Sequence, residues 1–350
     1  MKTRISNTIL AAMILVGIFK SSLGFNQKLS NAKDYHEYIS KEYSSVSVDL
    51  WNYLSLTAPL KKVLPAEKDR KELAKAVQAA INKISALSDF SGNTSLKDSV
   101  ISFLKLSQGI INQDYEGISK LENGIDQSYE SMETYLRTKE KAINKLNAAC
   151  KIVDAEENKF ASTNNIIMEG KEKNKNKIDD FIFSYNYFNE VYLIFFKGFK
   201  QEFALFEAEK NANLKSLEPA KNILVLSNSE GTKKLEGIQE DKENLKLKSV
   251  CGEMLKFYEA ASQENYTNAT NYLIEKDKFD KIRIPWEKKK ENQKSQRDGD
   301  IYNAALEAVT NAYNKFIDSN KKLTLARSKA VEKWNWTLEK FSDKYLGKKL

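Results

Sequence analysis

The chain has 350 residues, of which 41% are hydrophobic and 30% are charged, and it carries a formal net charge of +8. The hydrophobic content is enough for a buried core, which excludes bulk disorder. The 4 Pro and 13 Gly are few for this length and argue against a sheet-rich fold. Basic and acidic residues are mixed along the chain, so the mild excess of 56 over 48 argues against a nucleic-acid binder.

Residues 1–24 have the pattern of a secretory signal peptide. Lys2 and Arg4 precede an apolar run over residues 9–19, and Gly24 is a small residue at the position that a signal peptidase reads. The run is short against the roughly 20 residues needed to cross a bilayer. We therefore predict cleavage after Gly24 rather than an uncleaved membrane anchor. The mature chain is then exported, to the periplasm or the cell surface, and has no transmembrane span.

Apolar residues recur along the remaining chain at alternating steps of four and three, which predicts long helices with one apolar face. In chain order these apolar stripes run over residues 35–53, 125–160, 181–206 and 302–345. Two charged residues, Lys139 and Glu157, interrupt the second stripe. We interpret them as side chains that reach toward solvent or that loosen the packing between helices.

The third stripe is entirely aromatic. Core packing is the favoured interpretation at this spacing, and the alternatives are a membrane-inserting face or a platform for sugar or peptide ligands. Its members are Phe181, Tyr185, Phe188, Tyr192, Phe195, Phe199, Phe203 and Phe206.

These patterns predict an all-α fold, a bundle of long helices. An Asn- and Lys-rich stretch at 162–177 divides the mature chain into helical units over 25–165 and 170–350. Shifting the chain by 151 residues places Leu96 on Leu247 and Leu104 on Leu255. This weak repeat favours two tandem four-helix units, and chance similarity between helices is the alternative.

Turn-forming residues interrupt the C-terminal half. Pro219 is expected either to open a helix capped by Ser216 or to kink a longer helix, and residues 227–231 are expected to form a turn. The segment 263–300, which contains Pro285, is predicted to be an irregular insertion with at most a short helix.

The sequence contains no recognisable catalytic, cofactor or metal motif. His36 is the sole histidine, and we interpret it as a surface or helix-start residue rather than a general base or metal ligand. Glycine-rich phosphate loops, a Gly-x-Ser-x-Gly elbow and a calcium loop are all missing from the sequence. Cys150 and Cys251 are expected to be two buried thiols, with a single disulfide as the alternative. A hydrolase with a carboxylate pair is the least favoured hypothesis.

One small basic and aromatic patch is the candidate interaction site. Trp286 is followed closely by Lys288, Lys289 and Lys290, a combination that suits an anionic surface such as phospholipid headgroups or polysaccharide. The alternative is a solvated loop with no binding role.

The first predicted helix starts with the sequence Asp-Tyr-His-Glu-Tyr-Ile over residues 34–39. With the signal segment and helices carried to the C-terminus, this start resembles a family of uncharacterised helical surface or exported proteins of Leptospira and Bacteroidetes. The resemblance implies a secreted or surface location and no known activity, and it carries over no functional residue.

The sequence thus favours an exported, non-enzymatic helical protein of the bacterial envelope or surface. It would act through contacts with an unidentified protein or envelope component, without nucleic acid and without a cofactor. The alternative is a carrier that binds an apolar ligand between aromatic-lined helices.

Overall fold

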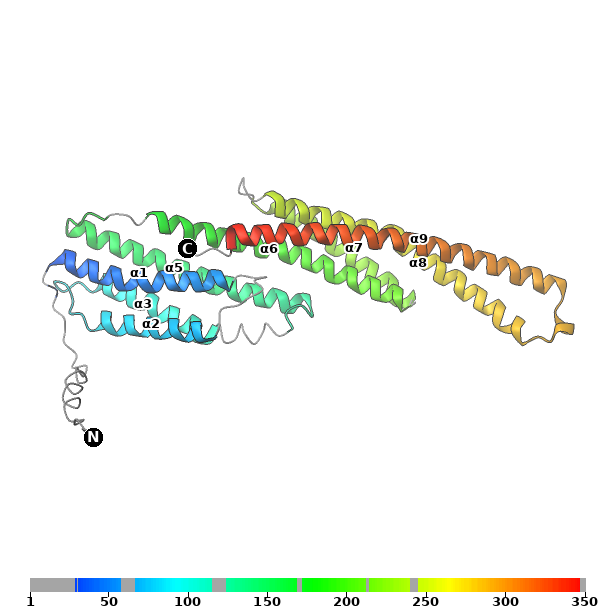
Figure 1. The fold of residues 1–350 in the computed structure, drawn as a ribbon, viewed down its shortest axis with the longest axis horizontal. Helices are drawn as coiled ribbons and strands as arrows, with labels where there is room; N and C mark the ends of the chain where they lie inside the picture. Colours follow the sequence, from blue (N-terminus) through cyan, green and yellow to red (C-terminus); the bar gives the residue numbers. More distant parts are fainter. Residues whose placement is uncertain are drawn as a thin grey trace, which may run out of the picture. The chain divides into compact units, whose positions relative to one another are not determined.

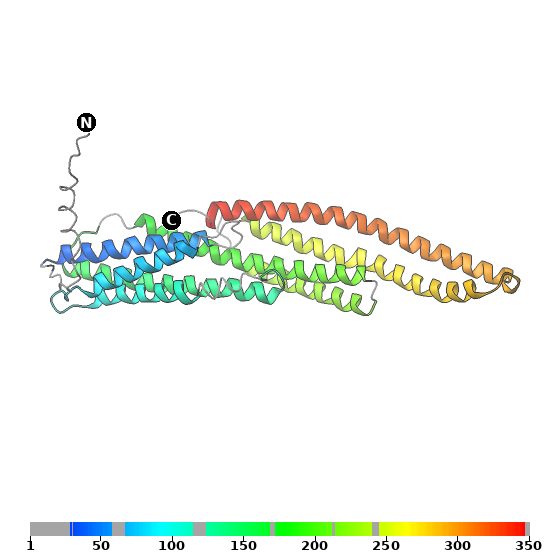
Figure 2. The ribbon, with the colours of Figure 1, turned by 60° about the horizontal axis from the view of Figure 1, so that its bottom comes forward.

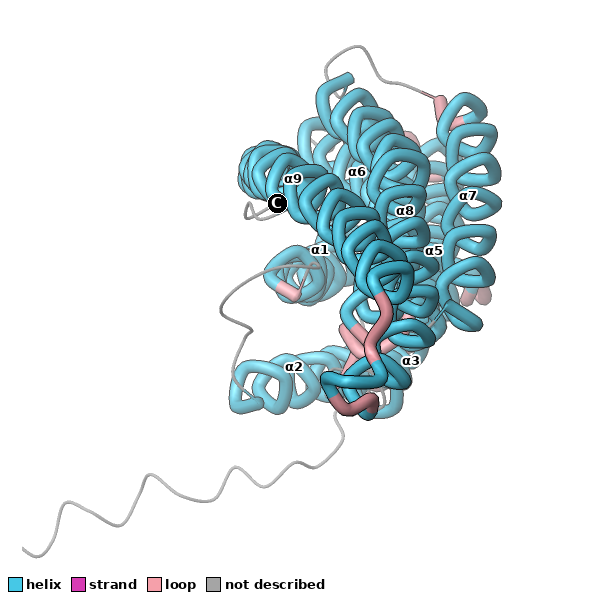
Figure 3. Tube along the Cα trace, turned by 90° about the vertical axis from the view of Figure 1, so that its right-hand side faces the viewer, coloured by secondary structure: helices cyan, strands magenta, loops and turns pink. Residues whose placement is uncertain are grey.

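The computed structural model describes residues 29, 31–57, 67–114, 124–168, 172–211, 214–239 and 245–346. Within these residues it contains eight α-helices and no strand, which confirms the predicted all-α fold (Figures 1 and 3). The predicted signal peptide, residues 1–24, lies outside them. The helices are α1 (Ala32–Leu56), α2 (Glu67–Ser85), α3 (Ser95–Gly109), α5 (Tyr129–Thr163), α6 (Glu172–Lys210), α7 (Leu214–Gly237), α8 (Leu245–Lys288) and α9 (Gln296–Phe341). Short π-helical or 3-10 turns, Ile110–Asp114 (η1), Glu291–Gln293 (η2) and Ser342–Leu346 (η3), follow α3, α8 and α9.

The chain forms two compact units that are interleaved in sequence. Unit 1 comprises the described residues within Met1–Ser47, Lys71–Gln108 and Leu146–Glu169, and unit 2 comprises the rest. Helices α1, α2 and α5 therefore contribute to both units. The tandem organisation with a boundary near 165–170 stays a prediction.

Aromatic side chains form the centre of unit 1. Tyr35 on α1 lies 5.4 Å from the ring of Phe90 and 5.6 Å from that of Phe160 on α5. Ile39 follows Tyr35 on the same face of α1, and Tyr43 follows Ile39 one turn later. The Tyr43 ring packs edge to face against Phe103 of α3, with ring centroids 5.1 Å apart. All of these except Phe90 are buried. The apolar stripe predicted at the start of the chain is thus the face of α1 that builds this core.

In unit 2 the aromatic stripe supplies much of the core. Its first five members, from Phe181 to Phe195, are buried, and Phe195 stacks on Trp334 of α9 with ring centroids 4.0 Å apart. The last members emerge from the core, since Phe203 is 51% exposed and Phe206 is half-buried. Core packing therefore holds for the N-terminal part of the stripe, and the C-terminal part is free for another role.

Helix α7 is continuous from Leu214 to Gly237, so the turn expected at 227–231 is wrong, and Pro219 lies inside the helix instead of opening it. Gly231 is needed for close packing: a Cβ there would lie 3.2 Å from Cγ2 of Ile194 on α6. Because the glycine has no side chain, α7 can approach α6 closely. Gly231, which suggested a turn in the sequence, thus lies at a contact between two helices.

The two charged interruptions of the second stripe are buried, which corrects their interpretation as solvent-directed side chains. Lys139 is 1% exposed, and its Nζ donates to the backbone carbonyl of Thr57 and to the Tyr135 hydroxyl, the latter at 3.0 Å. Glu157 is 2% exposed and accepts a hydrogen bond from Ser40. Both stay in the core because polar partners on another part of the chain compensate for their lost hydration.

Helices α8 and α9 form an antiparallel hairpin and lie side by side along their length (Figures 1 and 2). The predicted irregular insertion at 263–300 is wrong in extent, because α8 runs to Lys288 and α9 begins at Gln296. Pro285 lies in the last turn of α8, which ends three residues later, and its missing N–H removes one backbone hydrogen bond there.

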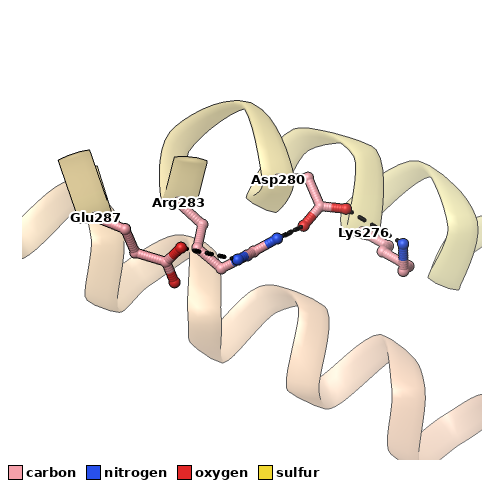
Figure 4. A network of polar contacts seen from close by, with 4 residues as sticks. All are labelled: Lys276, Asp280, Arg283 and Glu287. Atoms are coloured by element: carbon pink, nitrogen blue, oxygen red, sulfur yellow. Dashed lines mark hydrogen bonds and ion pairs between the residues drawn. The ribbon is translucent and has the colours of Figure 1, made fainter. Parts of the chain in front are cut away.

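A chain of ion pairs runs along the surface of α8 before this end (Figure 4). The Arg283 guanidinium contacts Asp280 at 2.9 Å and Glu287 at 3.0 Å, and Lys276 contacts the other oxygen of Asp280 at 3.2 Å. These pairs are spaced three and four residues apart, the spacing at which charges support a helix. They help explain why this charged stretch is helical instead of a loop.

Candidate functional site

His36 lies near the start of α1, as one of the two expected alternatives had it, but it is buried in unit 1 at 6% exposure instead of lying on the surface. Its Nε2 lies 3.3 Å from Oε1 of Glu157 and 3.5 Å from Oγ of Ser40, and its ring is parallel to that of Phe160. Ser40 also donates directly to the Glu157 carboxylate. These three residues bring α1 and α5 together inside one unit.

The cluster does not have the geometry of a nucleophilic triad. In a triad the acid and the nucleophile contact opposite nitrogens of the imidazole. Here Ser40 and Glu157 both approach Nε2, and the serine donates to the acid instead of to the histidine. We interpret the cluster as a structural polar contact within the unit 1 core.

A groove in unit 2 combines aromatic walls with a half-buried carboxyl, that of Glu209. The cavity has a volume of about 330 Å³. It lies where α6 ends and α8 and α9 continue. The residues that line it are Phe206, Glu209 and Lys210 of α6, Ala269, Tyr272 and Leu273 of α8, and Phe316 and Asn320 of α9. The emerging end of the aromatic stripe thus forms one wall.

Glu209 is held in this groove by an amide from α8. Its Oε2 accepts a hydrogen bond of 2.8 Å from Nδ2 of Asn265, and Oδ1 of Asn265 accepts one of 3.0 Å from the Ser319 hydroxyl on α9. These two hydrogen bonds between side chains therefore connect α6, α8 and α9. Removal from water raises the pKa of Glu209 to about 7, against the lowering effects of Asn265 and Arg327.

Arg327 does not neutralise Glu209, because it is paired with another acid. Its Nε donates at 2.8 Å to the buried Glu202, and a second guanidinium nitrogen contacts the same oxygen. Lys210 is directed outward, with a side chain 66% exposed and its Nζ 3.8 Å from Glu207. Glu209 therefore keeps an uncompensated carboxyl. A titratable group perturbed in this way, beside a cavity, is a mark of a functional site.

No motif in the sequence pointed directly to Glu209. A weak signal exists: Glu202 and Glu209 are seven residues apart on the helix that carries the aromatic stripe, so both lie on one face beside Phe206. Their partners Asn265, Ser319 and Arg327 come from two other helices, which the spacing within α6 does not reveal.

The predicted interaction residues lie at the tip of the α8–α9 hairpin, and the structure places them together. Trp286 is half-buried and stacks on Tyr302 of α9, with ring centroids 5.6 Å apart, while Nζ of Lys294 lies 4.9 Å from its ring centroid. Lys289 forms an ion pair with Asp298 at 2.7 Å, which lowers the pKa of that carboxyl to about 2. Trp286 and Lys289 thus hold the two helices of the hairpin together.

The other basic residues of the tip face solvent. Lys288 and Lys290 are exposed, as is Arg297 in the first turn of α9, and none of the three forms an ion pair with a described residue. The acid Asp300 lies nearby in sequence and accepts a hydrogen bond from Gln296. We define these three cations as the basic tip.

A second cavity, of about 380 Å³, lies between α5, α6 and α7 in unit 2. Part of its charged lining is paired: Lys197 contacts Glu230 at 2.9 Å, and Glu133 accepts a hydrogen bond of 3.0 Å from the Tyr129 hydroxyl.

Comparison with protein-family models, curated proteins and solved structures found no match to this chain. In the described part of the chain, no helix combines the length and apolar character that crossing a membrane requires. The same residues hold no group of three or more His, Cys, Asp or Glu side chains arranged to bind a metal ion. Cys150 and Cys251 are not joined in a disulfide; Cys251 is buried as predicted, whereas Cys150 is half-buried, so the expectation of two buried thiols is wrong for Cys150.

Proposed function

We propose that this protein is a non-enzymatic binding protein that acts outside the cytoplasm and docks on an anionic envelope surface through the basic tip of the α8–α9 hairpin. The exported setting rests on the signal-like pattern of residues 1–24. The surface is a phospholipid bilayer with anionic headgroups, which the cations of the basic tip would contact.

The observation that carries the proposal is the exposure of three cations without acidic partners at the end of a long hairpin. Every residue from 274 to 318 keeps intermediate or high exposure, so this part of the hairpin has no buried core. Ile284 and Ile301, near the tip, are each 45% exposed. A tip with exposed cations and apolar side chains suits a bilayer surface, where charged headgroups cover an apolar interior.

Vesicle co-sedimentation of the mature chain tests the proposal. We expect binding to vesicles that contain phosphatidylglycerol and much weaker binding to pure phosphatidylcholine. Replacing Lys288, Lys290 and Arg297 together by Glu should weaken binding about tenfold or more, since each basic residue near an anionic surface contributes about 1 kcal/mol. Binding should also fall as NaCl rises from about 0.1 to 1 M, because salt screens exposed charges.

A matched variant controls for net charge. Lys321, Lys322 and Lys329 are exposed residues of α9 outside the tip, and replacing them by Glu changes the charge equally. We expect this variant to bind nearly as well as the parent chain. Equal losses in both variants, or no preference for anionic vesicles, would refute docking through the basic tip and would favour a protein partner.

A further inference from the structure

We propose that the groove at the end of α6 is a binding site for a small organic cation, a primary amine on an apolar body, whose ammonium group pairs with Glu209. This site is separate from the basic tip and does not depend on the proposed docking function. The groove of about 330 Å³ has the size and the mixed apolar and polar lining of a small-molecule site.

Two acceptors of the groove have no donor among the described residues. Oε2 of Glu209 is occupied by Asn265, while Oε1 has no hydrogen-bond or ion-pair partner among the described residues. On the opposite side, Oδ1 of Asn320 is buried without a donor. An ammonium group has three N–H donors and no acceptor, so it suits both oxygens.

The position of Glu209 strengthens the preference for a cation. It lies in the last turn of α6, which ends at Lys210, and the free carbonyl groups at a helix C-terminus add negative potential. The nearby pair of Glu202 and Arg327 is neutral as a whole. Lys210, the other charged residue of the lining, has its Nζ 3.8 Å from Glu207, so Glu209 is the charged lining residue without an ion-pair partner among the described residues.

The rest of the lining selects an apolar body. Phe206, Ala269 and Leu273 offer carbon surface, and Tyr272 and Phe316 form a parallel ring pair with centroids 5.7 Å apart. A fully hydrophilic amine would leave this surface without contacts. An aryl or alkyl amine buries it and gains the hydrophobic contribution.

Isothermal titration calorimetry with 2-phenylethylamine tests the site in the mature chain. We expect 2-phenylethanol, which has the same apolar body and a neutral head, to bind about tenfold or more weakly, because it cannot pair with the carboxylate. With a Glu209 pKa of about 7, most of the carboxyl is ionised at pH 8 and little at pH 5.5. The affinity for the amine should therefore fall about tenfold or more between these pH values.

The variant Glu209→Gln removes the charge and keeps the hydrogen-bonding shape, and it should lose the amine preference and the pH dependence. Glu207→Gln is the matched control, since Glu207 is on the same helix but does not line the groove. It should bind like the parent chain. Equal affinity for amine and alcohol, undiminished binding by Glu209→Gln, or no amine binding at millimolar concentration would each refute the site.

Discussion

Lys139 and Glu157 show how a single charged residue in an apolar stripe is accommodated. Each is almost fully buried, and each contacts polar groups that are distant in sequence: Thr57 for Lys139 and Ser40 for Glu157. A charge buried without such partners would cost several kcal/mol, of the order of what a domain has in total stability. The partners explain why these positions need not be apolar.

Glu209 is the residue whose charge should destabilise the fold. Its pKa is raised from 4.5 to about 7, so the folded chain binds the proton more tightly than the unfolded chain. The stability contributed by this group is therefore greatest below about pH 4.5 and is lost as the pH rises toward 7. A ligand cation that pairs with the carboxylate would reverse this loss.

We expect Glu209→Gln to raise the free energy of unfolding at pH 8 by an amount on the order of 2 kcal/mol and to have little effect near pH 4.5. Urea unfolding of both chains, followed by circular dichroism across this pH range, measures the difference. A stability difference that is the same at every pH would show that the carboxyl does not titrate as described.

At the scale of elements, glycines set how closely the long helices of unit 2 approach. A Cβ at Gly198 would lie 2.9 Å from two ring carbons of the buried Tyr258, whereas a Cβ at Gly109 would have no atom within 4 Å. Both glycines are helical, so one sits at a contact between helices and the other does not.

This contrast predicts opposite effects of alanine. Gly198→Ala should destabilise the chain by about 1–3 kcal/mol, because the ring of Tyr258 must move in a packed core. Gly109→Ala should stabilise it by up to about 1 kcal/mol, since alanine is the better helix former. Thermal unfolding of the two variants beside the parent chain measures both, and a stabilising Gly198→Ala would rule out the close contact of α6 with α8.

The α8–α9 hairpin shows what a proline cue determines and what it leaves open. Pro285 lies within one turn of the end of α8. It does not indicate how far the helix extends before it. The aromatic contacts across the hairpin, such as Phe279 with Tyr302 and Tyr272 with Phe316, hold the preceding turns against α9.

At the scale of the whole molecule, Cys251 reports whether unit 2 opens. It is fully buried against α6, and burial raises its pKa to about 12, so both access and ionisation oppose its reaction. In a Cys150→Ser chain, iodoacetamide should modify Cys251 at least about a hundredfold more slowly in buffer than in strong urea, because reaction requires opening of the unit. Mass spectrometry of the alkylated chain measures the rate. Rapid labelling in buffer would contradict the packing of α8 against α6.

The sequence by itself determined that the described chain is all-α and which faces of several helices enter the core. Phe181, Tyr185 and Phe188 were predicted to be buried from their spacing, and they are. This works because a helix with one apolar stripe is a local property of the sequence, and burial of that stripe follows from the hydrophobic effect.

Only the tertiary structure decided which faces meet. The contact of His36 with Glu157 and the groove that joins Glu209, Asn265 and Asn320 both depend on helices distant in sequence. The same holds for Gly231, which marks a contact with Ile194 instead of a turn. Periodicity fixes the direction of a side chain on its own helix, but its partner is set by packing of whole helices, which depends on all the contacting faces at once.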